Sequence, residues 1–241
     1  MSKCLIISRY KEDISWLKVH NDFKIYLYNK GPKIEDQKFI NIINLNNVGR
    51  ESHTWIYHIV NNYNNLDDIN IFLQGRIDDL NCMAFSNPSD YLNDINEYGF
   101  KASRYGLLGP LHWKWHVGIE KNKKYKQNWD NFEISRSNIG FRKYAENLFP
   151  KIPRIVATSY GGCFAIKKEL IRKYDLDFYL ELLKSLSHHK NPIEGHFMER
   201  LWCYMFTENK NLSHAMLDVI KTKIERSKLY KLHKFIVKRI I

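Results

Sequence analysis

Charged, hydroxyl and amide side chains gather at three points where a strand-like apolar run ends. The first set follows CLIIS at residues 4–8, the second is NVGRESHT at residues 47–54, and the third follows INIFLQG at residues 69–75. The carboxyl ends of parallel strands meet at one edge of an open sheet, where ligands bind. We therefore expect one binding crevice, lined by Ser8, Arg9, Tyr10, Glu12, Asp13, Arg50, Glu51 and Gln74.

The NVGRESHT segment combines a charged pair with a hydroxyl and an imidazole where a strand gives way to a helix. A plain turn would need only Gly or Asn there. The guanidinium of Arg50 suits a phosphate group, and the N-terminus of the following helix favours the same anion. The alternative is a helix start that carries a surface pair between Arg50 and Glu51.

The adjacent acids Asp78 and Asp79 follow the strand-like run at residues 69–75. Paired carboxylates on such a loop can hold Mg²⁺ or Mn²⁺, which in turn binds a diphosphate. They are therefore the candidate metal ligands, and a solvated acidic turn is the alternative.

The segment EGHFMERLW at residues 194–202 contains a third candidate group. His196 and Glu199 are three residues apart, so they share one face of a helix. Glu199 could act as a general base toward a hydroxyl group. The alternative is a structural salt bridge from Glu199 to Arg200 or Arg172.

Alternating apolar segments predict the elements that position these groups. Strands are expected at residues 4–8, 23–29, 39–45 and 69–75, with a helix beginning near Arg50. On that helix, Trp55 and Ile59 would face the core, while Thr54 and His58 would lie on the other face. A strand, a Gly-Gly break and a second strand are expected over 155–166, with helices over 167–186 and 194–206. This alternation predicts an α/β fold with a mostly parallel sheet.

The chain has 241 residues, 44% of them hydrophobic, and a net charge of +12. Half of that excess lies in residues 213–241, which hold eight Lys or Arg and two acids. Leu229, Leu232, Phe235, Ile236 and Ile240 would form the apolar side of a basic helix there. Such a helix can lie on an anionic membrane or dock on its own domain.

The four cysteines are isolated from one another, so zinc-cluster spacing is absent. The first apolar run is too short for a signal peptide, and no segment reaches transmembrane length. We therefore predict a cytoplasmic protein that is peripheral at the inner face of the membrane if its tail binds there.

Several blocks together carry a resemblance to a known family: ISRYKEDISWL, NVGRESHTW, INIFLQG, GGCFAI and EGHFMERLW. In their order and spacing, over about residues 3–207, they resemble domain-of-unknown-function family 3431. The same order of blocks looks like nucleotide-sugar glycosyltransferases of the GT-A type.

The resemblance implies a Rossmann-like GT-A-type fold, with a nucleotide-binding half followed by an acceptor-binding half. It implies that residues 8–13 hold the base and ribose of the donor. It also places residues 74–79 where a metal-binding acidic motif is expected, although the sequence there reads RIDD. Glu199 would match a catalytic or acceptor-orienting acid.

The sequence thus predicts a catalytic domain at residues 1–210 and a basic helical tail at residues 211–241. The expected function is sugar transfer from a nucleotide-sugar donor to a cell-surface glycan or lipid-linked acceptor, with Mn²⁺ or Mg²⁺ as the candidate cofactor. The alternative is a non-catalytic basic protein that binds membrane or nucleic acid. Against nucleic acid, the sequence lacks a helix-turn-helix, zinc-finger or RNP-like pattern.

Overall fold

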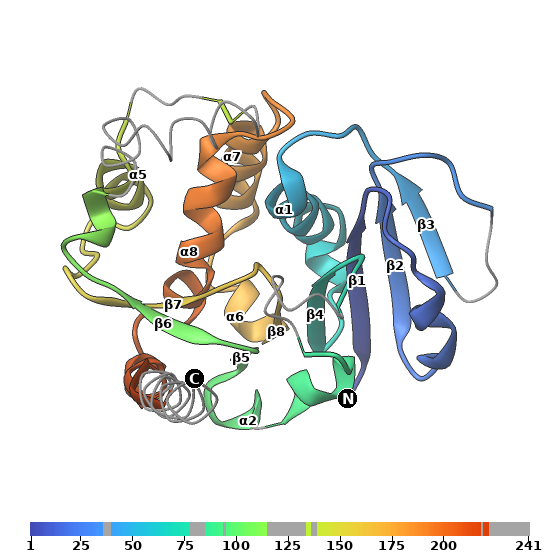
Figure 1. Ribbon diagram of the computed structural model, residues 1–241, viewed down its shortest axis with the longest axis horizontal. Helices are drawn as coiled ribbons and strands as arrows, with labels where there is room; N and C mark the ends of the chain where they lie inside the picture. The colour runs from blue at the N-terminus through green and yellow to red at the C-terminus, as the bar shows by residue number, and fades with distance from the viewer. Residues whose placement is uncertain are drawn as a thin grey trace, which may run out of the picture.

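The computed structural model describes residues 1–35, 40–77, 85–93, 95–114, 134–135, 139–217 and 219–221. Its centre is a six-stranded sheet with the order β3-β2-β1-β4-β8-β5 (Figure 1). The first four strands along the chain are β1 (Lys3–Arg9), β2 (Lys24–Asn29), β3 (Ile40–Asn44) and β4 (Ile69–Gln74). All four run parallel, which confirms the predicted strands and the mostly parallel sheet.

Two later strands complete the sheet in the opposite sense. β8 (Phe164–Lys167) pairs antiparallel with β4, and β5 (Phe100–Ala102) pairs antiparallel with β8. β6 (Tyr105–Leu108) and β7 (Val156–Ser159) form a separate antiparallel pair. The predicted Gly-Gly break therefore separates strands of two different sheets.

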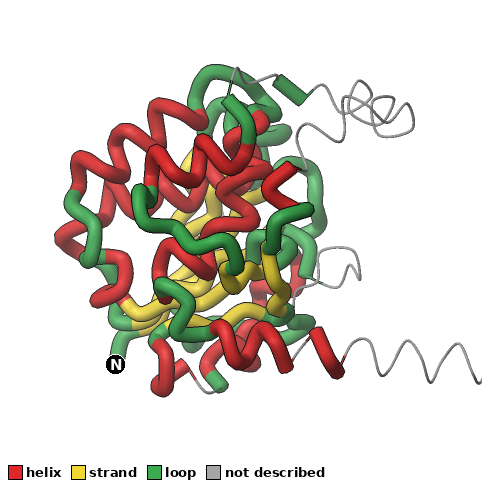
Figure 2. The backbone as a smooth tube through the Cα atoms, turned by 90° about the vertical axis from the view of Figure 1, so that its left-hand side faces the viewer, coloured by secondary structure: helices red, strands yellow, loops and turns green. Residues whose placement is uncertain are grey.

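Three helices share the side of the central sheet that carries the larger core cluster. They are α1 (Arg50–Asn62), α7 (Leu176–Leu186) and α8 (Ile193–Thr207). Figures 1 and 2 show them gathered on one side of the strands, with α5 (Phe141–Leu148) beyond α8. The short α6 (Lys168–Ile171) follows β8 directly.

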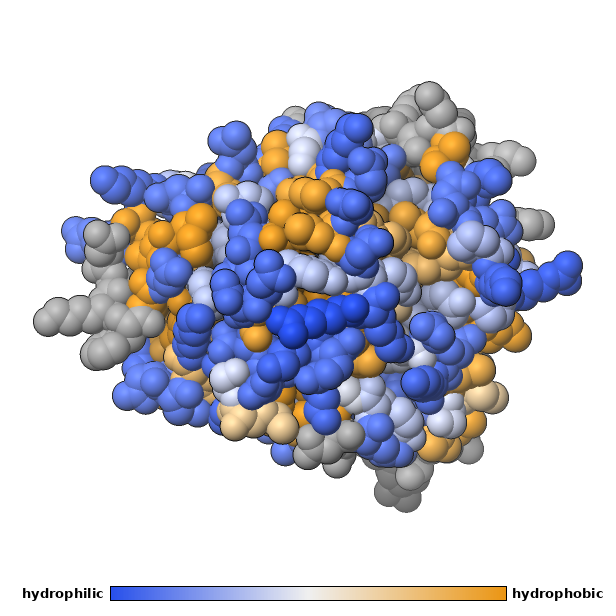
Figure 3. All heavy atoms as spheres, turned by 180° about the vertical axis from the view of Figure 1, so that it is seen from behind, coloured by the Kyte–Doolittle hydropathy of each residue, from blue (hydrophilic) through white to orange (hydrophobic). Residues whose placement is uncertain are grey.

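The opposite face of the sheet is covered by shorter elements. They are the 3₁₀ turns η1 (Ser15–Val19) and η3 (Pro88–Leu92) and the short helix α2 (Ile95–Tyr98). Two further 3₁₀ turns are η2 (Tyr63–Asn65) and η4 (His112–Lys114). In Figure 3 the surface seen from behind is mostly hydrophilic, with apolar areas interspersed.

The alternation of side chains along β1 explains why both faces need a cover. Cys4 and Ile6 belong to the core under the helices, whereas Leu5 and Ile7 belong to the core on the other face. All four are fully buried. Successive side chains of a strand point to opposite faces, so a continuous apolar run predicts a strand buried on both sides.

Helix α1 differs from its prediction in one respect. Thr54 and His58, which were expected on the exposed face, are 0% and 1% exposed. The reason is that this face of α1 lies on the sheet, where Thr54 meets Ser8 of β1 and His58 packs against Phe72 of β4. His58 Nδ1 and the hydroxyl of Tyr28 form a hydrogen bond of 2.8 Å, so the imidazole is buried together with a polar partner.

Candidate functional site

A cavity of about 290 Å³ lies at the carboxyl ends of β1 and β4. After β1 the chain adds β2 and β3 on one side, and β4 then lies on the other, so the strand order reverses between β1 and β4. Ligands of open α/β sheets bind at this kind of switch point. The lining residues are Ser8, Arg9, Tyr10, Glu12, Lys30, Asn47, Arg50, Glu51 and Gln74.

The cavity brings together all but one of the residues predicted to bind a nucleotide sugar. The exception is Asp13, which is not among the lining residues. Lys30 and Asn47 line the cavity but were not selected from the sequence. Lys30 directly follows β2, so the same strand-end argument applies to it. In the sequence, its place beside Gly31 and Pro32 is typical of a lysine in a surface turn.

The loop after β1 is held by its own charged side chains. The guanidinium of Arg9 donates to Asn29 Oδ1 at 2.7 Å and to the carbonyl of Glu12 at 3.0 Å. Glu12 Oε2 accepts from the backbone N–H groups of Tyr10 at 2.6 Å and Lys11 at 3.0 Å. These bonds fix the shape of the cavity wall, so Arg9 has a structural role in addition to any contact with a ligand.

Asp13 forms the turn that leads into η1. Its carboxylate accepts from the backbone N–H of Ser15 at 2.9 Å and from the Ser15 hydroxyl at 2.7 Å. These bonds to Ser15 lower the pKa of Asp13. The local geometry therefore accounts for Asp13 as a turn residue that precedes Ile14, the N-cap of η1.

The start of α1 adopts an uncommon backbone conformation. Gly49 has φ of +64° and Arg50 has φ of +52°, so two consecutive residues are left-handed. Gly tolerates this region, whereas a non-Gly residue there costs about 1–2 kcal/mol. The backbone N–H of Gly49 donates to the carbonyl of His189 at 2.9 Å, which ties the turn to the segment before α8. Such strain is typical of functional sites.

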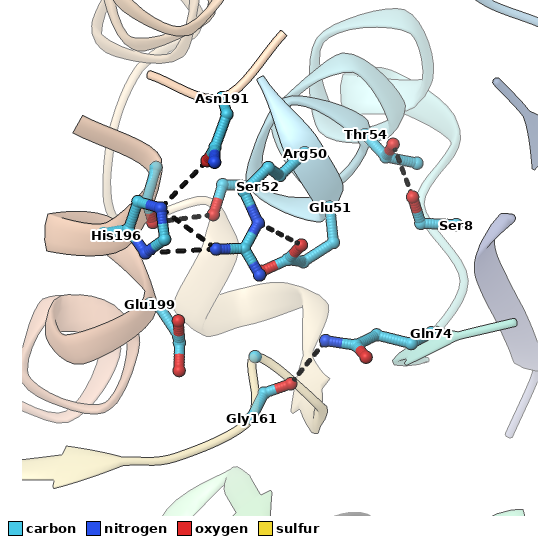
Figure 4. Close-up of polar contacts among 12 residues, drawn as sticks. Ser8, Arg50, Glu51, Ser52, Thr54, Gln74, Gly161, Asn191, His196 and Glu199 are labelled. Carbon is cyan, nitrogen blue, oxygen red and sulfur yellow. Dashed lines mark hydrogen bonds and ion pairs between the residues drawn. The ribbon is translucent and has the colours of Figure 1, made fainter. Parts of the chain in front are cut away.

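Arg50 contacts side chains from both α1 and α8 (Figure 4). Its Nε lies 3.4 Å from Glu51 Oε2, and its NH1 lies 3.0 Å from His196 Nδ1. The Glu51 carboxylate, with a smaller effect of Glu199, raises the pKa of Arg50. The guanidinium therefore lies within the electrostatic influence of carboxylates from both α1 and α8.

Both ring nitrogens of His196 lie near Arg50 NH1, Nδ1 at 3.0 Å and Nε2 at 3.1 Å. Nε2 also lies 2.9 Å from Asn191 Oδ1, an atom that only accepts, so we assign the proton to Nε2. Nδ1 is then the nitrogen that accepts from Arg50. Burial, with the charges of Arg50 and Arg200, lowers the pKa of His196 to about 3. A neutral imidazole with both nitrogens engaged is suited to orienting Arg50 rather than to transferring a proton.

Glu199 lies one turn further along α8. Its Oε2 is 3.8 Å from Arg200 NH1, whereas Arg172 donates to the carbonyls of Tyr63 and Asn64. Of the two salt bridges considered from the sequence, the structure forms the one to Arg200. The Glu199 side chain is 18% exposed, and Figure 4 shows its carboxylate directed toward the space between α8 and Gln74.

The Gly161-Gly162 turn closes the other side of this space. Both glycines have positive φ, of 82° and 66°. Gln74 Nε2 donates to the carbonyl of Gly161 at 3.0 Å, and Trp55 Nε1 donates to that of Gly162 at 3.0 Å. A Cβ added at Gly162 would lie 3.4 Å from Glu51 Cγ. The turn is thus anchored at the site and leaves bare backbone beside Glu51.

Some predicted features fall outside the described residues. Asp78 and Asp79 are among them, as are residues 222–241 of the basic tail. Within the described residues, no group of three or more His, Cys, Asp or Glu side chains could hold a metal ion. No helix in that part of the chain is both long and apolar enough to cross a membrane.

Comparison with known proteins identifies the family. The model of the family described as "Protein of unknown function (DUF3431)" matches residues 5–218. The chain therefore belongs to this family, as the sequence blocks indicated. Neither the curated proteins nor the solved structures gave a match.

Proposed function

We propose that this DUF3431 protein is a glycosyltransferase that moves a sugar from a nucleotide-sugar donor to a glycan or lipid-linked acceptor. The observation that carries the proposal is the cavity at the switch point of the sheet, where Arg50 lies between carboxylates of α1 and α8. The GT-A-type assignment is part of the proposal. Its support is the parallel half of the sheet, β3-β2-β1-β4, followed by an antiparallel β8.

The donor diphosphate would bind where cationic groups converge. Arg9, Lys30 and Arg50 line the cavity, and α1 begins beside it. Phosphate oxygens accept hydrogen bonds from such side chains and from the N–H groups of a helix N-terminus. Binding of Mn²⁺ or Mg²⁺ by Asp78 and Asp79 stays a prediction, which a comparison of EDTA with added metal would test.

Glu199 would act on the acceptor. Its carboxylate takes the proton of an acceptor hydroxyl while that oxygen forms a bond to the anomeric carbon of the donor sugar. The bond from the anomeric carbon to the diphosphate oxygen breaks, and the nucleoside diphosphate leaves with the electron pair. Arg50 is placed to stabilise the charge that develops on the leaving diphosphate.

In this arrangement His196 is a positioning residue. It accepts a hydrogen bond from Arg50 and donates one to Asn191, which fixes the guanidinium without adding a charge. The basic tail, which the sequence predicts to be an amphipathic helix, would keep the enzyme near a membrane-bound acceptor.

The experiment combines ligand screening with a transfer assay. Purified protein is heated with UDP, GDP, CDP and their sugars, each with Mn²⁺, Mg²⁺ or EDTA, and a nucleotide-selective rise in Tm is expected. Hydrolysis or transfer of the selected donor is then measured. Absence of any nucleotide effect at millimolar concentration would contradict the proposal.

Glu199→Gln separates binding from chemistry. Loss of a general base reduces the rate by about 10²–10⁴-fold, while the Tm shift with the donor is expected to persist. Glu181→Gln, at an exposed position of α7, is the matched control and should keep full activity. A fully active Glu199→Gln enzyme would rule out the role assigned to Glu199.

A further inference from the structure

Lys30 is a buried cation in the wall of the cavity. The residue is only 7% exposed. Its ammonium donates to the carbonyl of Val48 at 2.6 Å and to the carbonyl of Arg50. Among the described residues it forms no ion pair within 4.0 Å. The ammonium is therefore solvated by two backbone dipoles and has no counter-charge in direct contact.

The charged and titratable groups around Lys30 do not supply that counter-charge. From α1, it faces Glu51, whose carboxylate is engaged by Arg50 at 3.4 Å. His53 of the same helix is held neutral, because burial and the charge of Lys30 lower its pKa to about 4. From β1 and its loop, the cavity adds Arg9 and Glu12, which bond to the loop itself.

Burial of a cation without a counter-charge disfavours its charged form. It lowers the pKa of Lys30 to about 7, and Glu51 opposes this effect only in part. At neutral pH the lysine is thus divided between its charged and neutral forms. A phosphate group in the cavity would favour the charged form strongly, because the interaction takes place away from bulk water.

We propose that Lys30 is a phosphate-recognition residue of the donor site, and that its amine takes up a proton from solvent when a nucleoside diphosphate binds. The inference rests on the proposed function, since it assigns a role within that same cavity. The geometry that supports it is the buried Nζ at the cavity wall, whose hydrogen bonds within the described part of the chain go to the carbonyls of Val48 and Arg50.

The direction of the pH effect follows from linkage. The ligand raises the pKa of Lys30 above its value in the free protein, so binding is strongest where Lys30 is already charged. Affinity is then constant below about pH 7 and falls above it, by up to about tenfold per pH unit, until the pH passes the pKa of the bound state. The terminal phosphate ionises near pH 6, so it contributes little between pH 7.5 and 9.

Isothermal titration calorimetry with UDP, GDP and CDP measures this proton directly. Each titration is run at pH 8 in Hepes and in Tris, whose ionisation enthalpies differ, so the difference in heat gives the number of protons exchanged. For the wild-type protein we expect an uptake of about half a proton or more. Binding without proton uptake would overturn the assignment of Lys30 and leave nucleotide binding intact.

Three variants assign the proton to Lys30. Lys30→Met should bind the same nucleotide about tenfold or more weakly at pH 7.5, without proton uptake. Lys30→Arg keeps a permanent charge, so it should bind without uptake and without a decline in affinity up to pH 9. Lys33→Met, at an exposed lysine of the same loop, should behave as wild type.

Two different Lys30 variants are used in case one of them does not fold. A single folded variant is sufficient to show whether the proton uptake depends on Lys30. Proton uptake that persists in either variant would overturn the proposal. Absence of binding by all three nucleotides in the wild-type protein would overturn both this inference and the proposed function.

Discussion

Replacing Gly49 by Ala should destabilise the protein and disturb the site at once. An added Cβ would lie 2.4 Å from the carbonyl oxygen of Leu186 and 2.4 Å from His53 Cβ. Relief of such overlap by local shifts costs about 1–3 kcal/mol. The left-handed backbone destabilises the folded state by about 1–2 kcal/mol more. Alanine also reduces the conformational freedom of the unfolded chain, which offsets about 0.4–1 kcal/mol of this loss. We expect a net loss of about 2–4 kcal/mol in the free energy of unfolding.

Equilibrium urea unfolding, followed by tryptophan fluorescence and circular dichroism, measures this loss. Gly109→Ala is the matched control, because among described residues its Cβ would come no closer than 4.0 Å, to His112 Nδ1. Its free energy of unfolding should stay within about 0.5 kcal/mol of wild type. A loss below 1 kcal/mol for Gly49→Ala would show that the turn before Arg50 is not held as described, and the strain argument would fail.

Two further predictions concern acid and the loop after β2. The free energy of unfolding should fall as pH drops from 6.5 toward 4, by up to about 1.4 kcal/mol per pH unit for each of three buried histidines. Burial lowers the pKa values of His53 to about 4 and of His58 and His196 to about 3, so only the unfolded chain takes up these protons. Urea unfolding at pH 7.5 and 5 tests this, and equal stabilities would contradict it. Gly31→Ala would place a Cβ 1.5 Å from the carbonyl oxygen of Tyr10. We expect the free energy of unfolding to fall by about 2 kcal/mol or more, which should lower Tm by about 4 °C or more. An unchanged melting curve would refute the close approach of these two segments.

The meeting of these strand ends could be predicted from the sequence, because it depends on chain direction and not on side-chain detail. Ser8 pairs with Gln74 across β1 and β4, so two segments 66 residues apart meet at one edge once both strands are parallel. The apolar runs at residues 4–8 and 69–75 were sufficient to predict this. The same reasoning would have placed Lys30 at this edge, because it directly follows β2. A lysine beside a Gly-Pro turn, however, has the appearance of a surface residue.

Burial on α1 could not be deduced from helical periodicity alone. Thr54 and His58 are polar, so the sequence pattern assigned them to an exposed face. That face of α1 lies on the sheet, where the ring of His58 packs against Tyr28 of β2 and Phe72 of β4. The hydroxyl of Thr54 lies 2.9 Å from that of Ser8, and this partner is visible only in three dimensions.

The roles of His196 and Arg50 also required the structure. The sequence places His196 and Glu199 on one helix face, but it does not show that Arg50 lies against the imidazole. That contact depends on the left-handed turn at Gly49 and Arg50, a conformation that propensity does not predict for arginine.

The insertion of β8 beside β4 has a consequence for synthesis on the ribosome. Phe72 of β4 pairs with Phe164 of β8, so the growing chain exposes an open β edge until the later strand has been made. At about 5–20 residues per second this interval lasts roughly 5–20 s. An unpaired edge is a template for association with other chains. All residues that line the cavity lie between Ser8 and Gln74, so they are synthesised well before the strand that protects this edge.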